Sequence, residues 1–204
     1  GSKTYELGKD FTAEGSSHSF DFTYEGQRLE NISLAMAGQH QVANASLAIM
    51  ASLLLQKDYP KVTSGLIKAA LAHASWLGRT EFLMPNLMID GAHNNESVKV
   101  LIVLFRAEYT DKDIELLFAA IDTKPIDSML AQLESVGDLT VTSFEYPNSV
   151  KLDKYPATYK QVSDFQTWIE EHVTTDKDKL YVITGSLYFI SQVRKWILEQ
   201  TSGV

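Results

Sequence analysis

The stretch NLMIDGAHNNESVKVLIVLF, residues 86–105, decides the fold of this chain. It opens with the apolar run 87–89, breaks at Asp90-Gly91, and resumes over 98–105 with apolar residues at positions i, i+3, i+4 and i+7. A buried strand that passes through a short turn into a helix is the building unit of parallel α/β sheets. The stretch therefore predicts a strand, a polar turn that holds Asp90 and His93, and a helix.

The same alternation of strand and helix continues to the end of the chain. Strand-like apolar runs occur at 114–121, 139–141 and 180–184, and helical patterns over 98–105, 126–133 and 189–197 separate most of the runs. This order predicts βαβ units. The predicted fold class is α/β, with a Rossmann-like, mainly parallel sheet flanked by helices.

The first part of the chain has a different pattern. Residues 3–36 read as β structure, with a turn at Glu25-Gly26 between two alternating segments, which predicts an antiparallel hairpin. Two helices are expected next, one over 42–55 and one after Pro60. The alternating residues are Phe20, Phe22 and Tyr24, then Ile32, Leu34 and Met36. The residues at helical spacing are Ala43, Leu47, Met50, Ala51 and Leu54, then Leu66, Ile67, Ala70, Leu71 and Ala74.

A boundary is expected near Leu77-Gly78, where the pattern changes. It gives two predicted domains, 1–77 and 78–204. Of the 204 residues, 45% are hydrophobic and 22% are charged, which is ordinary for a globular protein.

Charge and composition exclude several classes of function. The chain has 18 basic and 26 acidic residues, a net charge of -8. Because phosphate backbones are held mainly by Lys and Arg, this balance argues against nucleic acid or an anionic membrane as a partner. No apolar run approaches the roughly 20 residues of a membrane span and no signal peptide is recognisable, so a cytoplasmic location is expected. The absence of cysteine excludes disulfides and thiolate chemistry.

Each predicted strand of the second domain ends in small polar residues. Ligands of parallel sheets bind beyond the carboxyl ends of the strands, so these residues are expected at one edge. The four ends are Asp90-Gly91-Ala92-His93-Asn94, Asp122-Thr123-Lys124, Tyr146-Pro147-Asn148 and Thr184-Gly185-Ser186. A purely structural explanation stays open, because Asn94 suits a helix N-cap and Asp-Gly is a common turn dipeptide.

Three segments together resemble the folylpolyglutamate synthase family, which includes the bifunctional dihydrofolate synthases and is related to the Mur ligases. They are GQHQVANASLAIMASLLL (38–55), WLGRTEFL…NLMIDGAHNNES (76–97) and LYVITGSLYFISQVR (180–194). The pattern is G-x-H-Q-x-x-N-A, G-R-x-E, D-G-A-H-N and T-G-S-L-Y, in that order. The resemblance covers essentially the whole chain and corresponds to the C-terminal half of such an enzyme. It implies that 1–77 is the end of the central ATPase domain and that 78–204 is the glutamate ligase domain.

The resemblance implies an ATP-dependent ligase that adds L-glutamate to folate through an acyl phosphate, with Mg²⁺ and as a monomer. It assigns Asn44, Arg79 and Asp90 as ATP contacts and His93 as the catalytic residue near the transferring phosphate or the glutamate. Since His93 precedes a helix whose positive end disfavours an imidazolium, a neutral ring that donates one hydrogen bond to an anionic oxygen is expected. No residue is assigned as a metal ligand, because the magnesium ligands are expected mostly in the other half.

Two departures from the family matter. The P-loop of the G-T-x-G-K-G-S kind is absent from this sequence, so the chain alone is expected to be inactive. The stretch Tyr146-Pro147-Asn148-Ser149 also lacks the arginine that the family often carries after that proline. Two alternatives stay open: part of a Mur-type peptide ligase, and a non-catalytic nucleotide-binding module. The pair His40-Gln41 followed by Asn44-Ala45 favours the folate branch.

Overall fold

A computed structural model describes residues 1–201 of the chain. It contains two compact units, Gly1–Trp76 and a second unit that begins at Leu77. Each unit has its own hydrophobic core.

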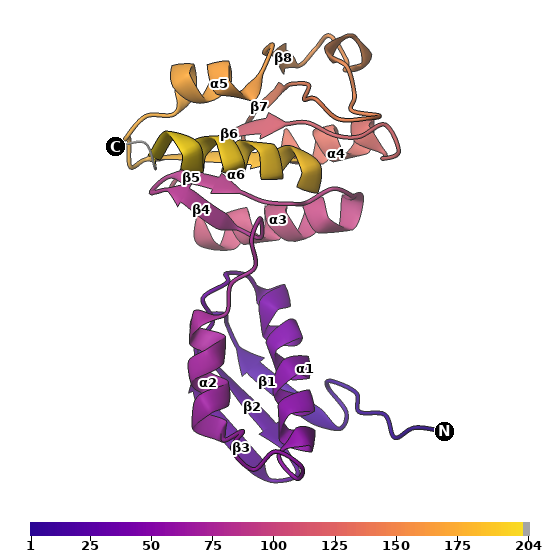
Figure 1. Cartoon of the computed structure of the whole chain (residues 1–204), viewed down its shortest axis with the longest axis vertical. Coiled ribbons are helices and arrows are strands. Elements are labelled where there is room, and N and C mark those ends of the chain that lie inside the picture. Colours follow the sequence, from indigo (N-terminus) through magenta and orange to yellow (C-terminus); the bar gives the residue numbers. More distant parts are fainter. Residues whose placement is uncertain (202–204) are drawn as a thin grey trace. The chain divides into compact units, whose positions relative to one another are not determined.

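The first unit is a three-stranded antiparallel sheet with two helices (Figure 1). The strands are β1 (Phe11–Gly15), β2 (Phe20–Tyr24) and β3 (Gln27–Ile32), and the helices are α1 (Gln39–Leu55) and α2 (Ser64–His73). The alternation in β2 places Phe20 and Phe22 in the core, and Tyr24 packs against it partly buried. The buried core consists of Phe11, Phe20, Phe22, Leu29, Ile32, Val42, Ala45, Ile49, Met50 and Ile67.

Strand β3 ends earlier than predicted. The sequence pattern extends it through Leu34 and Met36, but the ladder stops at Ile32. Asn31 adopts a left-handed conformation, with φ of 54°, and its N–H donates to the Asp21 carboxylate at 2.8 Å instead of to a neighbouring strand. This conformation is an irregularity inside β3, because Ile32 still pairs with Phe20. The ladder ends after Ile32, and the Leu34 N–H donates to the Ser17 carbonyl at 2.9 Å.

Helix α1 is apolar on two faces, and the predicted residues are divided between them: Met50 is buried, whereas Leu47, Ala51 and Leu54 are exposed. The core face carries Val42, Ala45, Ile49 and Met50. Leu47 and Leu54, which the pattern selected, are 52% and 42% exposed. Since the helix has no charged residue, periodicity alone cannot decide between its faces. We call the exposed row Asn44, Leu47, Ala48, Ala51 and Leu54 the α1 stripe.

Helix α2 shows the same ambiguity on a smaller scale. Ile67 is the residue that it buries, whereas Leu66 is 60% exposed although the pattern places both on one face. Thr63 caps the helix by accepting a hydrogen bond from the Leu66 N–H at 3.3 Å.

The second unit is the predicted α/β fold. Its six-stranded sheet has the order β4-β5-β9-β6-β7-β8, and every neighbouring pair is parallel except the antiparallel pair β4 and β5. The strands are β4 (Glu81–Met84), β5 (Leu87–Ile89), β6 (Asp113–Phe118), β7 (Asp138–Val141), β8 (Lys160–Gln161) and β9 (Lys179–Thr184). The helices are α3 (Asn95–Glu108), α4 (Ile126–Leu133), α5 (Phe165–His172) and α6 (Leu187–Thr201), with a 3-10 turn at Leu152–Lys154.

Helices cover both faces of this sheet. Helices α5 and α6 pack on one face, where Phe165, Trp168, Phe189 and Val193 meet Ile183 of the central strand. Helices α3 and α4 contact each other, and Figure 1 shows them behind the sheet while α6 lies in front of it. Burial on both faces explains why β9 is a continuous apolar run instead of an alternating one.

The two faces of α1 give a direct test of the first core. Ile49 is fully buried, so Ile49→Ala should lower the free energy of unfolding of the first unit by about 2–5 kcal/mol. Leu47→Ala, two residues away on the α1 stripe, should change it by less than about 1 kcal/mol. Urea unfolding followed by circular dichroism measures both. Equal losses for the two variants would show that the stripe is covered in solution.

Candidate functional site

The carboxyl ends of four strands of the second unit meet at one edge of its sheet. Strand β5 pairs in parallel with β9, β9 with β6, and β6 with β7. The segments that follow these strands are joined by backbone hydrogen bonds: Gly185 donates to the Ala92 carbonyl at 3.1 Å, and Asp122 donates to the Asn148 carbonyl at 2.8 Å. The prediction that Asp90, Asp122 and Gly185 share one edge is confirmed.

Asp90 lies immediately after β5 and organises the loop around it. One carboxylate oxygen accepts from the Thr80 N–H at 2.8 Å and the other from the Ala92 N–H at 2.9 Å. Its own N–H continues the sheet by donating to the Ile183 carbonyl at 3.0 Å. The residue is only 6% exposed, so these bonds to backbone N–H groups stabilise a carboxylate that has lost most of its water. Asp90 therefore ties the segment before β4 to the turn after β5.

Two glycines make this close packing possible. A Cβ on Gly91 would lie 2.3 Å from Cδ2 of Leu187, so the turn after β5 packs directly against the first turn of α6, and a side chain at position 91 would require Leu187 to move. Gly185 has a φ of +112°, and a Cβ there would lie 2.5 Å from the Ala119 carbonyl oxygen. The glycines bring the loops after β5, β6 and β9 into contact.

His93 is half-buried and held by the same turn. Its ring Nδ1 donates to the Gly91 carbonyl at 2.8 Å, and its backbone N–H donates to Ser97 Oγ at 3.0 Å. Nε2 has no hydrogen-bond partner among residues 1–201. In the neutral ring this nitrogen is an acceptor, because the proton is on Nδ1. The expectation that a neutral His93 donates to an anionic oxygen is therefore wrong for this geometry.

Asn94 has the structural role that the sequence suggested, as a helix N-cap. Asn94 is the N-cap of α3, with its side chain accepting from the Ser97 N–H at 2.8 Å, and Ser97 completes a reciprocal capping box. Such a cap fixes the start of the helix. It consequently fixes the position of His93, one residue before the cap.

Arg79 presents a charge without a partner. The residue is half-buried, and its guanidinium makes no hydrogen bond or ion pair within the described part of the chain. Its neighbours Gly78 and Thr80 are both bonded to the turn at Asp90-Gly91, at 2.8 Å in each case. The base of the Arg79 side chain is thus fixed, while its five donors stay available.

Asn44 belongs to helix α1 of the first unit. It lies at the N-terminal end of the α1 stripe and is exposed. Its Nδ2 donates to Gln41 Oε1 at 3.1 Å, which leaves the Asn44 oxygen as an acceptor. Within the second unit the structure brings together Arg79, Asp90 and His93.

Sequence reasoning missed an aromatic cluster at the same edge. Tyr146, after β7, stacks on Tyr188 in the first turn of α6 with 4.0 Å between ring centroids, and Phe144 stacks behind it. The hydrogen bond with Tyr188, together with burial, raises the pKa of Tyr146. The sequence shows one tyrosine at a strand end and one at a helix start, but it does not indicate that the two rings stack on each other.

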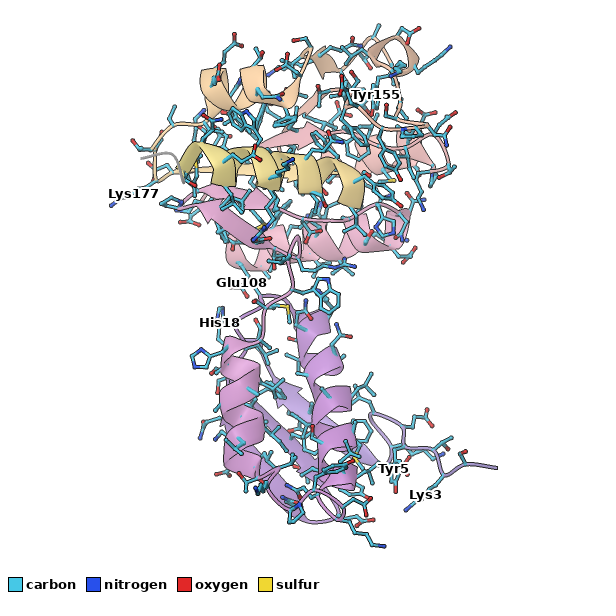
Figure 2. The ribbon with its side chains drawn as sticks, in the orientation of Figure 1. Lys3, Tyr5, His18, Glu108, Tyr155 and Lys177 are labelled. Carbon is cyan, nitrogen blue, oxygen red and sulfur yellow. The ribbon has the colours of Figure 1, made fainter. Side chains whose placement is uncertain are left out.

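Tyr155, labelled in Figure 2, anchors the loop after β6 from inside the second unit. Its hydroxyl accepts from the Ala120 N–H at 3.1 Å. Burial raises the pKa of Tyr155 to about 12, since the phenolate would lose its water.

Residues 1–201 show neither a metal-binding cluster nor a membrane-spanning helix. These residues contain no group of three or more His, Asp or Glu side chains that could hold a metal ion. None of the helices in the same range combines the length and the apolar character needed to cross a membrane.

Comparison with known proteins gives the relatives of the chain. It is 32% identical over 189 residues to the dihydrofolate synthase/folylpolyglutamate synthase of Bacillus subtilis (strain 168), a match to 86% of this chain and 43% of that protein. It is 27% identical over 113 residues, 54% of this chain and 24% of that protein, to the UDP-N-acetylmuramate–L-alanine ligase of a Hydrogenobaculum species. No family model matches.

A solved structure shows the same fold. E. coli FolC in complex with ADP superposes with a TM-score of 0.82 at 22% identity, over 97% of this chain and 48% of that one. The resemblance seen in the sequence is confirmed. The chain spans less than half the length of the relatives and the structure it matches.

Removing the Asp90 carboxylate should loosen the second unit. Asp90→Ala leaves two N–H groups without an acceptor, so we expect a loss of about 2–4 kcal/mol in the free energy of unfolding, and a smaller loss for Asp90→Asn, which keeps one acceptor. Asp111→Ala is the control, since that carboxylate is exposed and pairs with the adjacent Lys112. Urea unfolding followed by tryptophan fluorescence measures all three. An Asp90→Ala protein as stable as Asp111→Ala would refute the role of this carboxylate.

Proposed function

We propose that this chain, a homologue of the folylpolyglutamate and dihydrofolate synthases, is part of an ATP-dependent ligase that joins L-glutamate to a folate. The longer and closer match to the folate enzyme than to the muramate ligase supports the folate branch. In this proposal, residues 1–77 are the end of a central ATPase domain and 78–204 form a glutamate ligase domain. Action in the cytoplasm as a monomer belongs to the same proposal.

The proposed reaction has two steps. A carboxylate oxygen of the folate attacks the γ-phosphorus of ATP, the bond to the β-γ bridging oxygen breaks, and an acyl phosphate and ADP result. The amino nitrogen of glutamate then attacks the acyl carbon, and inorganic phosphate leaves as the amide forms. Both steps depend on positioning and on charge stabilisation of phosphate oxygens.

Arg79 carries the proposal. A half-buried guanidinium that has no partner within residues 1–201, on a backbone fixed by Asp90, suits an anion that arrives from outside. Its planar fork of donors matches two oxygens of a phosphate group. We assign Arg79 to the phosphates of the nucleotide.

Asp90 and Asn44 are assigned to the nucleoside. The Asp90 carboxylate accepts hydrogen bonds and lies at the carboxyl end of β5, so it suits a ribose hydroxyl as donor. Asn44 offers an amide oxygen and donors that suit the edge of adenine.

The ring of His93 favours the glutamate end of the reaction. With Nδ1–H engaged by the Gly91 carbonyl, the neutral ring presents Nε2 as an acceptor. An acceptor suits the incoming amino group, which must lose a proton as the amide forms, and it does not suit a phosphate oxygen. We therefore assign His93 as the proton acceptor from the glutamate nitrogen.

The magnesium ion that accompanies ATP would neutralise phosphate charge. Following the resemblance, we place its protein ligands mostly in the other half of the enzyme. The sequence also has no P-loop. We accordingly propose that the chain alone binds nucleotide weakly and does not turn it over.

Nucleotide binding by the chain tests the assignment of Arg79. In a titration with ATP followed by ¹⁵N NMR, the amides next to Arg79 should shift, and Arg79→Gln should weaken binding by about tenfold, as expected for the loss of a charge-assisted contact. Arg106→Gln, an exposed arginine in the last turn of α3, is the matched control. If Arg79→Gln binds ATP as the wild type does, the phosphate contact is wrong.

The role of His93 is tested in a complete enzyme that contains this sequence. His93→Ala should lower kcat by on the order of 10²-fold, the usual effect of losing a general base, while hydroxylamine still traps the acyl phosphate. His73→Ala, on the surface of α2, should leave kcat unchanged. Full activity in a folded His93→Ala enzyme would leave that residue a structural loop histidine.

A further inference from the structure

The segment 78–81, which carries Arg79, is held in a strained conformation. Gly78 has a φ of 72° and Thr80 a φ of 44°. Left-handed backbone is unusual for a β-branched residue and costs free energy. In addition, Thr80 Oγ1 is buried without a hydrogen-bond partner in residues 1–201. Other interactions must therefore stabilise this segment.

Two of these interactions come from the turn after β5. Gly91 donates to the Gly78 carbonyl at 2.8 Å, and Asp90 accepts from the Thr80 N–H at 2.8 Å. They fix the carbonyl side of Gly78 and the amide of Thr80. The Gly78 N–H lies outside their reach.

Glu81 supplies the remaining interaction. Its Oε2 accepts from the Gly78 N–H at 2.7 Å, and its Oε1 accepts from Arg194 Nε at 2.8 Å. One carboxylate thus joins the beginning of the segment to helix α6. Glu81 is the final residue of the G-R-x-E motif, to which neither the sequence nor the proposed reaction gave a role.

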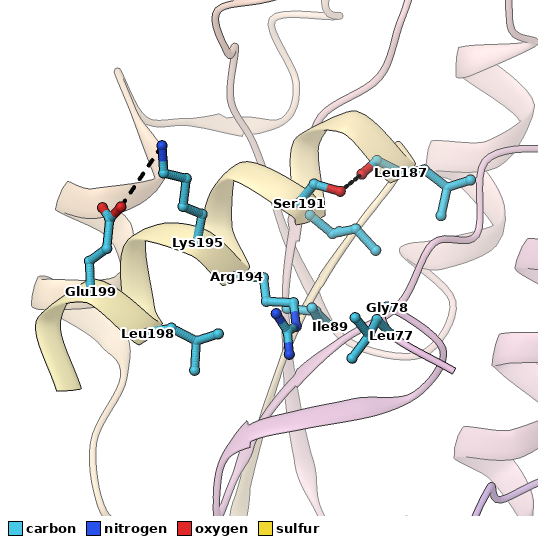
Figure 3. Close-up of a pocket in the computed structure, with 10 residues that line it drawn as sticks. Leu77, Gly78, Ile89, Leu187, Ser191, Arg194, Lys195, Leu198 and Glu199 are labelled. Carbon is cyan, nitrogen blue, oxygen red and sulfur yellow. Dashed lines mark hydrogen bonds and ion pairs between the residues drawn. The ribbon is translucent and has the colours of Figure 1, made fainter. Parts of the chain in front are cut away.

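Arg194 can hold the Glu81 carboxylate in place although it is not a core residue. It lines a pocket of about 440 Å³ together with Gly78, Ile89 and Leu187, and Figure 3 shows Arg194 and Gly78 on the walls of that pocket. The side chains of Arg194 and Glu81 are 30% and 20% exposed. Partly exposed ion pairs contribute little to stability, so stability alone is a weak reason for this one.

We propose that Glu81 and Arg194 are a positioning pair that holds the strained segment 78–81 in the conformation that presents Arg79 to phosphate. The inference rests on the proposed function, because it takes Arg79 as the phosphate contact. Neither residue of the pair touches the nucleotide. They act through the Gly78 N–H, as Asp90 acts through the Thr80 N–H on the other side of Arg79.

The same contacts also have a simpler consequence, the anchoring of edge strand β4 to α6. Anchoring of β4 and positioning of Arg79 predict different effects when Arg194 is replaced. If the pair only anchors β4, its loss alters local exchange of amide hydrogens and leaves phosphate binding intact. If the pair positions Arg79, its loss weakens phosphate binding while the fold is retained.

The experiment compares Arg194→Gln, Arg194→Lys and the control Lys195→Gln, whose lysine is the next residue of α6 and pairs with Glu199. Hydrogen exchange at the Gly78 amide and the affinity for ATP are both followed by ¹⁵N NMR on the whole chain. Arg194→Gln should speed exchange at Gly78 at least tenfold and weaken ATP binding about fivefold. Arg194→Lys, which keeps a donor for Glu81, should recover part of both, and Lys195→Gln should change neither.

Two results would refute the role of Glu81 and Arg194 as a positioning pair. One is unchanged hydrogen exchange at the Gly78 amide in Arg194→Gln, and the other is faster exchange in that variant with unchanged affinity for ATP. A wild-type chain that binds no ATP would instead contradict the proposed function. Thr80→Gly gives a second check, since it relieves the strain without touching the pair. It should reduce the effect of Arg194→Gln on exchange, and an undiminished effect would also count against the proposal.

Discussion

The carboxylate of Asp90 is the interaction on which the second unit's functional edge depends. It is a buried charge, and burial of a charge is tolerated only when hydrogen bonds replace the lost water. Here the donors are backbone N–H groups of Thr80 and Ala92, which belong to segments on either side of the β4–β5 hairpin. Satisfying one carboxylate therefore sets the course of both segments, and with them the places of Arg79 and His93.

Much of this edge could be predicted from the sequence. Strand-to-helix junctions with small polar residues are visible in the pattern, and the parallel pairing of β5, β9 and β6 then places Asp90 and Gly185 together. What the pattern could not give was the direction of hydrogen bonds. The ring nitrogen of His93 that carries the proton is fixed by the Gly91 carbonyl, two residues earlier. The ion pair between Glu81 and Arg194 joins residues 113 positions apart.

The first unit shows a different limit of sequence reasoning. Helix α1 has apolar residues around its whole circumference, so its period identifies a helix without identifying the side that packs on the sheet. The face with Ile49 enters the core, and the α1 stripe stays exposed in residues 1–201. Strand β3 ends at Ile32 for a similarly local reason: the chain leaves the ladder after Ile32, and the Leu34 N–H donates to the Ser17 carbonyl instead. Both outcomes depend on tertiary contacts that hydrophobic alternation does not encode.

The central claim is that Arg79, held by Asp90 and Glu81, receives the phosphates of a nucleotide. The most direct measurement is a crystal structure of a complete enzyme containing this sequence, with ADP bound. Phosphate oxygens should lie within hydrogen-bond distance of the Arg79 guanidinium, with Gly78 and Thr80 still bonded to Glu81 and Asp90. A nucleotide bound elsewhere, with the Arg79 guanidinium making no contact to it, would show that Arg79 does not bind phosphate.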